Sequence, residues 1–194
     1  QPMRRPLFGF AVLAVASATL AAQPVARERA LFDGKTANGW RSFKKSTFPD
    51  HGWIIQDGWL KKLAKGNNRD GGGDIITVDT FDNFDLQFEW RVVEGANSGV
   101  KYLVTEDRNG PVAHEYQIID DVHNPLGLKG GPIRRSSALD NILPPGPNAQ
   151  LRSADPLNKK ADPWNEGRIV MQGTKVEHWL NGEKVVEFDL GTAP

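Results

Sequence analysis

The chain has 194 residues, 39% of them hydrophobic and 25% charged, which is typical of a globular protein with one domain or a small pair of domains. Its 24 Lys and Arg residues match its 24 Asp and Glu residues, so charge gives no reason to expect nucleic acid or an anionic membrane as a partner. The absence of cysteine excludes disulfides, thiolate metal sites and a cysteine nucleophile.

The first residues have the order of a secretory signal peptide. A basic start at residues 3–5 is followed by an apolar run over residues 7–20 and by small residues up to Ala22. A membrane-spanning helix is the alternative, but it usually needs about 20 apolar residues, and this run is shorter and rich in alanine. We therefore expect cleavage of residues 1–22, a linker over residues 23–29, and a periplasmic or secreted protein without a stable membrane anchor.

The rest of the chain reads as short strands joined by turns, and we expect one domain over residues 30–194. Residues 53–60 are a predicted hairpin that turns at Asp57-Gly58, because this pair favours the tight turns of hairpins. Apolar and polar side chains then alternate with the period of two that strands have. The predicted strands of this part are residues 75–78, 84–92, 100–105 and 114–119.

The second half of the chain begins with a long irregular segment. Residues 120–162 are rich in Pro and Gly, and loops of this length are usually functional rims or disordered insertions. Residues 168–171 are a further predicted strand, and residues 176–188 are a hairpin that turns at Asn181-Gly182. Short strands with turn signals between them predict an all-β sandwich.

Alternation would place polar side chains of three neighbouring segments on one sheet face, opposite the apolar side chains that fill the sandwich. These side chains are Gln87, Glu89, Arg91, Lys101, Glu115 and Gln117. Such a face offers both donors and acceptors, which sugar hydroxyls need. The alternative is a solvated outer face, and for Gln87 and Glu89 we favour that alternative.

Four tryptophans could stack on sugar rings, since an aromatic ring supplies a flat apolar face. They are Trp40, Trp53, Trp59 and Trp164. Packing in the core is the favoured alternative for Trp53 and Trp59. The chain contains no Gly-x-Ser-x-Gly, P-loop or dinucleotide fingerprint.

Two further groups of polar residues have open interpretations. His178 lies between two apolar neighbours at spacing two, so it is either a packed core residue or a base. Asp120 and Asp121, beside His123, could hold a divalent cation through their oxygens, although adjacent acids at a strand end are common without a metal. No histidines have the spacing of a His-Glu-x-x-His metal site.

Four groups of short motifs follow one another along the chain. They are Leu31–Lys35 with Gly39-Trp40; Asn97–Tyr102, an Asn-Ser-Gly strand; Glu115–Asp120, a Glu-x-Gln-x-x-Asp strand; and Trp164-Asn165 followed by Val176–Gly182, with a His-Trp-Leu-Asn-Gly element. In these motifs the chain resembles the 3-keto-disaccharide hydrolase family, from Ala30 to Phe188. The resemblance implies an antiparallel jelly-roll sandwich like that of concanavalin A-type lectins and glucanases.

The chain departs from the family pattern in two places. Where the family usually has Leu-Tyr-Asp in the long loop, this chain has Ala138-Leu139-Asp140. The further pair of strands that ends the family's sandwich is absent before Pro194. We therefore expect a sandwich that lacks its last C-terminal strands.

The resemblance implies a hydrolase or lyase that cleaves 3-keto-glycosides or 3-keto-disaccharides, and the predicted signal peptide implies that this enzyme is exported. The C3 ketone acidifies the C2 proton, a base removes it, a cation or hydrogen-bond donors stabilise the enolate, and the C1 leaving group departs before water adds. A non-catalytic carbohydrate-binding module of the same fold is the alternative. The metal requirement stays open, with a divalent cation as the candidate cofactor.

Nine residues receive hypothetical roles on this basis. The catalytic candidates are Glu115 as base, Lys101 and Arg91 as stabilisers of the enolate, and Asp120 or His178 as the group that assists the leaving group; the substrate-binding candidates are Asn97, Gln117, Trp164 and Asn165.

Overall fold

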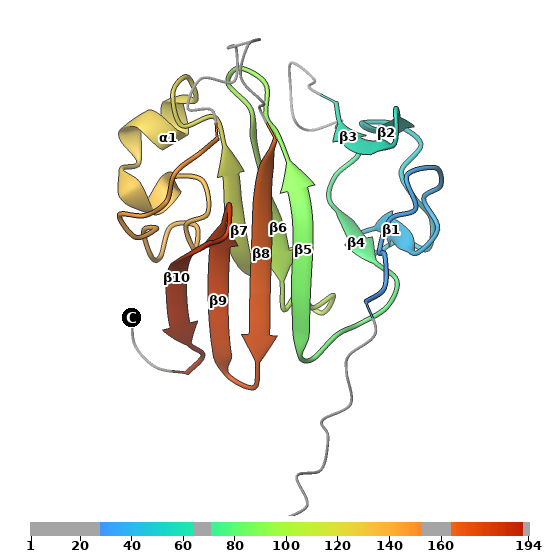
Figure 1. The fold of residues 1–194 in the computed structure, drawn as a ribbon. Coiled ribbons are helices and arrows are strands. Elements are labelled where there is room, and N and C mark those ends of the chain that lie inside the picture. Colours follow the sequence, from blue (N-terminus) through green and yellow to red (C-terminus); the bar gives the residue numbers. More distant parts are fainter. Residues whose placement is uncertain (1–27, 64–70, 153–163, 192–194) are drawn as a thin grey trace, which may run out of the picture. The chain divides into compact units, whose positions relative to one another are not determined.

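In a computed structural model of the protein, the structure describes residues 28–63, 71–152 and 164–191, so the predicted signal peptide lies outside the described residues. Residues from Leu31 onward form one compact unit. Its elements are β1 (Trp40–Ser42), β2 (Trp53–Gln56), β3 (Trp59–Lys62), β4 (Ile75–Thr77), β5 (Phe84–Trp90), β6 (Asn97–Tyr102), β7 (His114–Ile119), α1 (Pro125–Lys129), the 3₁₀ turn η2 (Pro132–Arg134), β8 (Asn165–Gln172), β9 (Lys175–Leu180) and β10 (Glu183–Asp189) (Figure 1).

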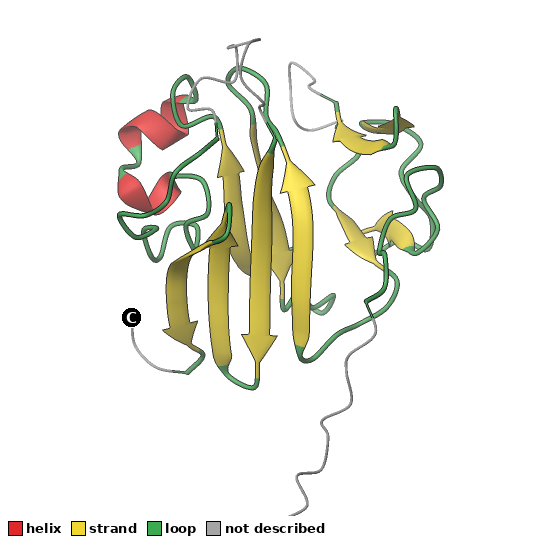
Figure 2. Ribbon diagram, viewed as in Figure 1, coloured by secondary structure: helices red, strands yellow, loops and turns green. Residues whose placement is uncertain are grey.

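Antiparallel strands dominate the fold (Figure 2). The largest sheet has four strands in the order β10-β9-β8-β5, and β6 pairs with β7 in a second layer that lies behind it in Figure 1. Two small ladders, β1-β4 and β2-β3, precede these layers in the chain. The predicted all-β sandwich is confirmed.

The core lies between the two layers. Alternate residues of β6 and β7 point inward and pack against alternate residues of β5, β8 and β9. The buried hydrophobic residues of this cluster include Trp90, Tyr102, Tyr116, Ile118, Ile169, Val176 and Leu180. Because strand side chains alternate, the residues between them face away from the core.

Both predicted hairpins are confirmed. Asn181 and Gly182 join β9 to β10 with φ values of 50° and 88°, and Asp57 and Gly58 join β2 to β3 with φ values of 56° and 81°. Two consecutive positive φ values are the signature of the type I′ turn, whose twist matches that of the strands.

The segment predicted to be irregular contains more structure than the sequence indicated. Asn124 caps α1 by accepting a hydrogen bond from the backbone N–H of Leu126, and Pro125 occupies the first turn. Leu139 forms an isolated bridge with Tyr116, so part of this segment runs beside β7. A five-residue helix is too short to produce a helical apolar period, which explains why it was missed. In the described part of the chain no helix is long and apolar enough to cross a membrane.

The expectation of one shared polar face is wrong. β5 pairs with β8 and not with β6, so Gln87 and Glu89 point outward from the four-stranded sheet, where both are exposed. Lys101 and Glu115 point outward from the other layer. Residues 91–96 carry the chain from one layer to the other, and strand alternation alone cannot reveal such a crossing.

Candidate active site

The outer face of the β6–β7 layer carries the polar residues of the two family-like strands. Lys101 and Glu115 are cross-strand partners, and Gly99 is the partner of Gln117. Tyr116, between Glu115 and Gln117, is fully buried on the core side. Glu115 therefore projects from the side of β7 that faces away from the core, as the alternation predicted.

Lys101 forms an ion pair with a residue outside the β6–β7 layer. Its Nζ lies 2.8 Å from Oδ2 of Asp74, the residue that precedes β4. Both side chains are partly exposed, so the pair is a surface ion pair whose contribution to stability is small. Its effect is to place an ammonium group beside Glu115.

The segment next to β7 supplies a second charged pair. The backbone N–H of Asp140 donates to the carbonyl of Glu115 at 3.0 Å, which puts the two residues side by side. Asp140 accepts a hydrogen bond from Gln117 Nε2 at 2.9 Å and one from Arg134 Nη1 at 2.8 Å. Gln117 is almost fully buried, so it positions Asp140 and does not lie open to a ligand.

These side chains form one group, which we call the Glu115 cluster. Its members are Asp74, Lys101, Glu115, Gln117, Arg134 and Asp140. Sequence reasoning found three of the six and missed Asp74, Arg134 and Asp140. The only available signal was the position of Asp140 in the Ala-Leu-Asp element that resembles the family's Leu-Tyr-Asp.

Within the described ranges, no hydrogen bond or ion pair engages the Glu115 carboxylate. Burial raises the pKa of the Glu115 carboxyl above its ordinary value, and the carboxylates of Asp140 and Asp74 raise it further. The cations Lys101 and Arg134 oppose this rise without cancelling it. A partly buried carboxylate with increased proton affinity, and with no hydrogen-bonding partner in the described part of the chain, is suited to general-base chemistry.

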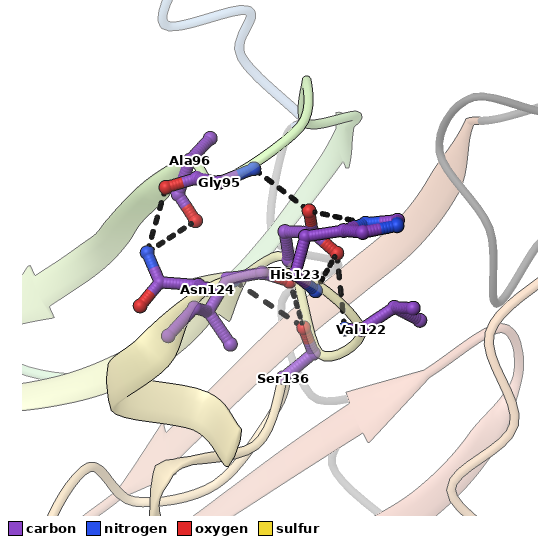
Figure 3. Close-up of polar contacts among 8 residues, drawn as sticks. Gly95, Ala96, Val122, His123, Asn124 and Ser136 are labelled. Atoms are coloured by element: carbon purple, nitrogen blue, oxygen red, sulfur yellow. Dashed lines mark hydrogen bonds and ion pairs between the residues drawn. The ribbon is translucent and has the colours of Figure 1, made fainter. Parts of the chain in front are cut away.

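Asp120 has a different environment, to which Gly95, Val122 and His123, labelled in Figure 3, contribute. Its carboxylate accepts hydrogen bonds from the backbone N–H groups of Gly95, Val122 and His123, at 2.8, 3.0 and 3.1 Å, and lies 3.0 Å from Nδ1 of His123. Burial alone would raise the pKa of Asp120, but these donors outweigh it and lower the pKa. Asp120 thus ties the turn after β7 to the loop before β6.

The divalent-cation hypothesis finds no support in this turn. Asp121 accepts a hydrogen bond from the backbone N–H of Ser136, and Asp120 already has a donor at each oxygen. Across residues 28–63, 71–152 and 164–191, no three His, Asp or Glu side chains gather as they would around a metal ion.

His178 lies in the core between the layers. Its Nε2 is 2.8 Å from the Tyr102 hydroxyl, its Nδ1 is 3.0 Å from the carbonyl oxygen of Ser137, and the residue has no exposed surface. Burial lowers the pKa of His178 to about 4. Of the two interpretations of this residue, the geometry matches the packed, hydrogen-bonded core histidine. His178 lies on the core side of β7, whereas Glu115 projects from the opposite side.

Three other predicted residues lie at the end of the sandwich where β5 ends and β8 begins. The guanidinium carbon of Arg91 is 4.1 Å from the ring centre of Trp59 and 5.0 Å from that of Trp164. Asn165 is buried, and its Oδ1 accepts hydrogen bonds from Asn181 Nδ2 and from a neighbouring backbone N–H. Trp59 is therefore a partly exposed stacking partner and not a core residue, in contrast to the favoured expectation.

Asn97 is exposed at the start of β6, on the same face as Gly99 and Lys101. The predicted site residues thus fall into separate places. Lys101, Glu115, Gln117 and Asn97 share the outer face of β6–β7, whereas Arg91, Asp120 and His178 do not lie on it.

Comparison with known proteins identifies the family to which the chain is similar. Residues 27–194 match the model of the 3-keto-α-glucoside-1,2-lyase-like domain. A curated 3-keto-disaccharide hydrolase from Bacteroides thetaiotaomicron is 37% identical over 178 residues, which cover 84% of this chain. The chain spans 58% of the length of that relative.

Two crystal structures of predicted glycosyl hydrolases from Parabacteroides distasonis are also similar. The structure at 1.70 Å has a TM-score of 0.65 and 28% identity, and the match covers 84% of this chain and 71% of that one. The structure at 2.00 Å has a TM-score of 0.54 and 29% identity, with coverage of 78% and 73%. With its strand motifs, its sandwich and this family match in agreement, the chain belongs to the 3-keto-α-glucoside-1,2-lyase-like domain family.

Proposed function

We propose that the protein is a hydrolase of 3-keto-glycosides, with 3-keto-disaccharides as the substrate class and Glu115 as the catalytic base. Family membership and the similarity to a 3-keto-disaccharide hydrolase support the substrate class. One observation carries the assignment of the base. Glu115 is the carboxylate of its cluster that has a raised pKa and no hydrogen-bonding partner among the described residues.

The proposed reaction begins at C2 of the oxidised sugar. The C3 ketone acidifies the C2 proton, and Glu115 removes it. Negative charge then develops on the C3 oxygen. Lys101 is the candidate for its stabilisation, because the ammonium has three donors and Asp74 accepts from one of them. The C1–O bond breaks, the leaving oxygen takes up a proton, and addition of water across C1 and C2 yields the free 3-keto sugar.

Arg134 takes the place of Arg91 as the second cation of this proposal. It lies in the Glu115 cluster through its ion pair with Asp140, whereas Arg91 stacks on tryptophans. Asp140 is already engaged by Gln117 and Arg134, so the cluster does not offer two free carboxylates. An ordinary glycosidase needs such a pair around the acetal, and the elimination route needs one base.

The test is turnover of 3-keto-trehalose or a 3-keto-glucoside, run beside the corresponding unoxidised sugars. Glu115→Gln keeps the shape of the side chain but cannot accept a proton, so we expect kcat to fall about 10²- to 10⁴-fold while binding survives. Glu89→Gln is the matched control, because Glu89 is an exposed carboxylate on the outer face of the other sheet. Intact turnover in both variants would refute the assignment of the base.

A non-catalytic carbohydrate-binding module is the second candidate. The surface formed by Trp59, Arg91 and Trp164 favours it, because aromatic rings and guanidinium donors are the groups that bind sugars without reacting with them. A wild-type protein that binds sugars and turns over neither oxidised nor unoxidised substrates would support this candidate over the enzyme.

A further inference from the structure

Gly99 occupies the middle of β6, where the backbone does not require a glycine. Its φ lies outside the left-handed region in which glycine is favoured, and the residue pairs regularly with Gln117. Glycine within a strand usually costs stability, since it has no side chain to pack, and it often marks a place where another group approaches closely.

The approaching group is the side chain of Glu115. A Cβ atom at position 99 would lie 2.1 Å from Oε1 of Glu115 and 2.7 Å from both its Cγ and its Cδ. The cross-strand partner of Glu115 is Lys101, two residues further along β6. The glutamate therefore leans diagonally across the strand pair, and its carboxylate occupies the space that a side chain at position 99 would fill.

We propose that Gly99 is a positioning residue, whose missing side chain creates the slot that holds the Glu115 carboxylate against β6. The inference rests on the proposed role of Glu115 as the base. In the slot the carboxylate is partly shielded from water and stays beside the ammonium of Lys101. The slot also gives a reason for a glycine at this position of β6, next to the strand that carries Glu115.

A substitution at position 99 separates this role from a merely structural one. In Gly99→Ala the new methyl group meets Cγ, Cδ and Oε1 of Glu115, which belong to a flexible side chain and not to the backbone, so Glu115 can make room by changing its rotamer. Alanine is also preferred over glycine within a strand. We therefore expect the melting temperature to be unchanged or slightly raised, whereas turnover should fall about 10²-fold, the cost of a 1 Å misplacement of a reacting group.

The direct readout is the titration of the Glu115 side-chain carboxyl by carbon NMR, in the full chain. In Gly99→Ala the displaced carboxyl should be more hydrated, so its pKa should fall toward the ordinary value of glutamate. Gly110→Ala is the control, because a Cβ at that position meets nothing within 4 Å and its φ is ordinary. An unchanged Glu115 titration in Gly99→Ala would overturn the proposal, whether or not the protein proves to be an enzyme.

A double-mutant cycle gives the second test. In the Glu115→Gln background there is no base to misplace, so adding Gly99→Ala should leave the residual rate within about twofold. A further loss of the same size as in the wild-type background would show that Gly99 acts through another group, and the proposal would fail. If the wild type turns over no 3-keto substrate, the proposed function fails, while the NMR titration still decides the placement of Glu115.

Discussion

Lys101 and Glu115 are cross-strand partners, yet Lys101 forms its ion pair with Asp74, at 2.8 Å. The ammonium thus stands beside Glu115 without closing an ion pair with it. A base that formed a tight ion pair would lose proton affinity, and a base remote from any cation would leave the enolate unsupported. The arrangement allows a nearby cation and a carboxyl with a raised pKa to coexist.

We expect Lys101→Met to raise the pKa of Glu115 further, because Lys101 is the largest influence that lowers it. The proposed reaction requires ionised Glu115, so the acidic limb of the kcat/KM–pH profile should move to higher pH. Asp140→Asn should move the same limb to lower pH, since Asp140 raises the pKa of Glu115. Lys175→Met, at an exposed residue of β9, is the control. Shifts of the same sign in the Lys101 and Asp140 variants would contradict the proposed electrostatics.

His178 should make the folded state sensitive to acid. Its pKa is about 4 in the folded protein and 6.5 in a solvated histidine, so the unfolded chain takes up a proton first as the pH falls. The stabilisation is complete above pH 6.5 and is lost progressively toward pH 4, and it amounts to about 3 kcal/mol at most.

Urea denaturation at pH 7 and pH 5 measures this effect. In His178→Gln the free energy of unfolding should be lower at pH 7, because the core is perturbed, but it should change less between the two pH values. His51→Gln, at an exposed histidine, should keep the pH dependence of the wild type. An unchanged pH dependence in His178→Gln would assign the acid sensitivity to other groups.

Asp120→Ala should destabilise the fold, because it removes the acceptor of three backbone N–H groups and of His123 Nδ1. Leaving such donors without a partner should lower the free energy of unfolding by about 2 to 4 kcal/mol. Thermal unfolding measures the loss, with Asp82→Ala, in an exposed loop, as the control. Normal stability combined with lost turnover would instead indicate that Asp120 acts on the substrate.

The export of the protein is a separate proposal. The order of basic, apolar and small residues before Gln23 predicts cleavage by signal peptidase and a periplasmic or secreted location. N-terminal sequencing of the protein purified from its natural host checks this, and we expect a start near Gln23. A soluble protein that retains Met3 would refute it.

Local features of the chain were predictable from the sequence because their causes are local. Asn181-Gly182 and Asp57-Gly58 determine their hairpins through backbone conformations that few other residues adopt. The alternation in β5, β6 and β7 determines which side chains oppose the core, and it places Glu115 on the side of β7 opposite Tyr116. The motifs of the strands also indicated the family.

The tertiary structure alone decided which faces meet. Strand alternation is the same whichever partner a strand has, so only long-range pairing could show that β5 joins β8 while β6 joins β7. The same packing brings Asp74, Arg134 and Asp140 to Glu115 from segments with no distinctive pattern. It also encloses His178 between two layers. The orientation of Glu115, the proposed base, was thus readable from one strand, whereas its electrostatic environment depends on contacts between residues far apart in the chain.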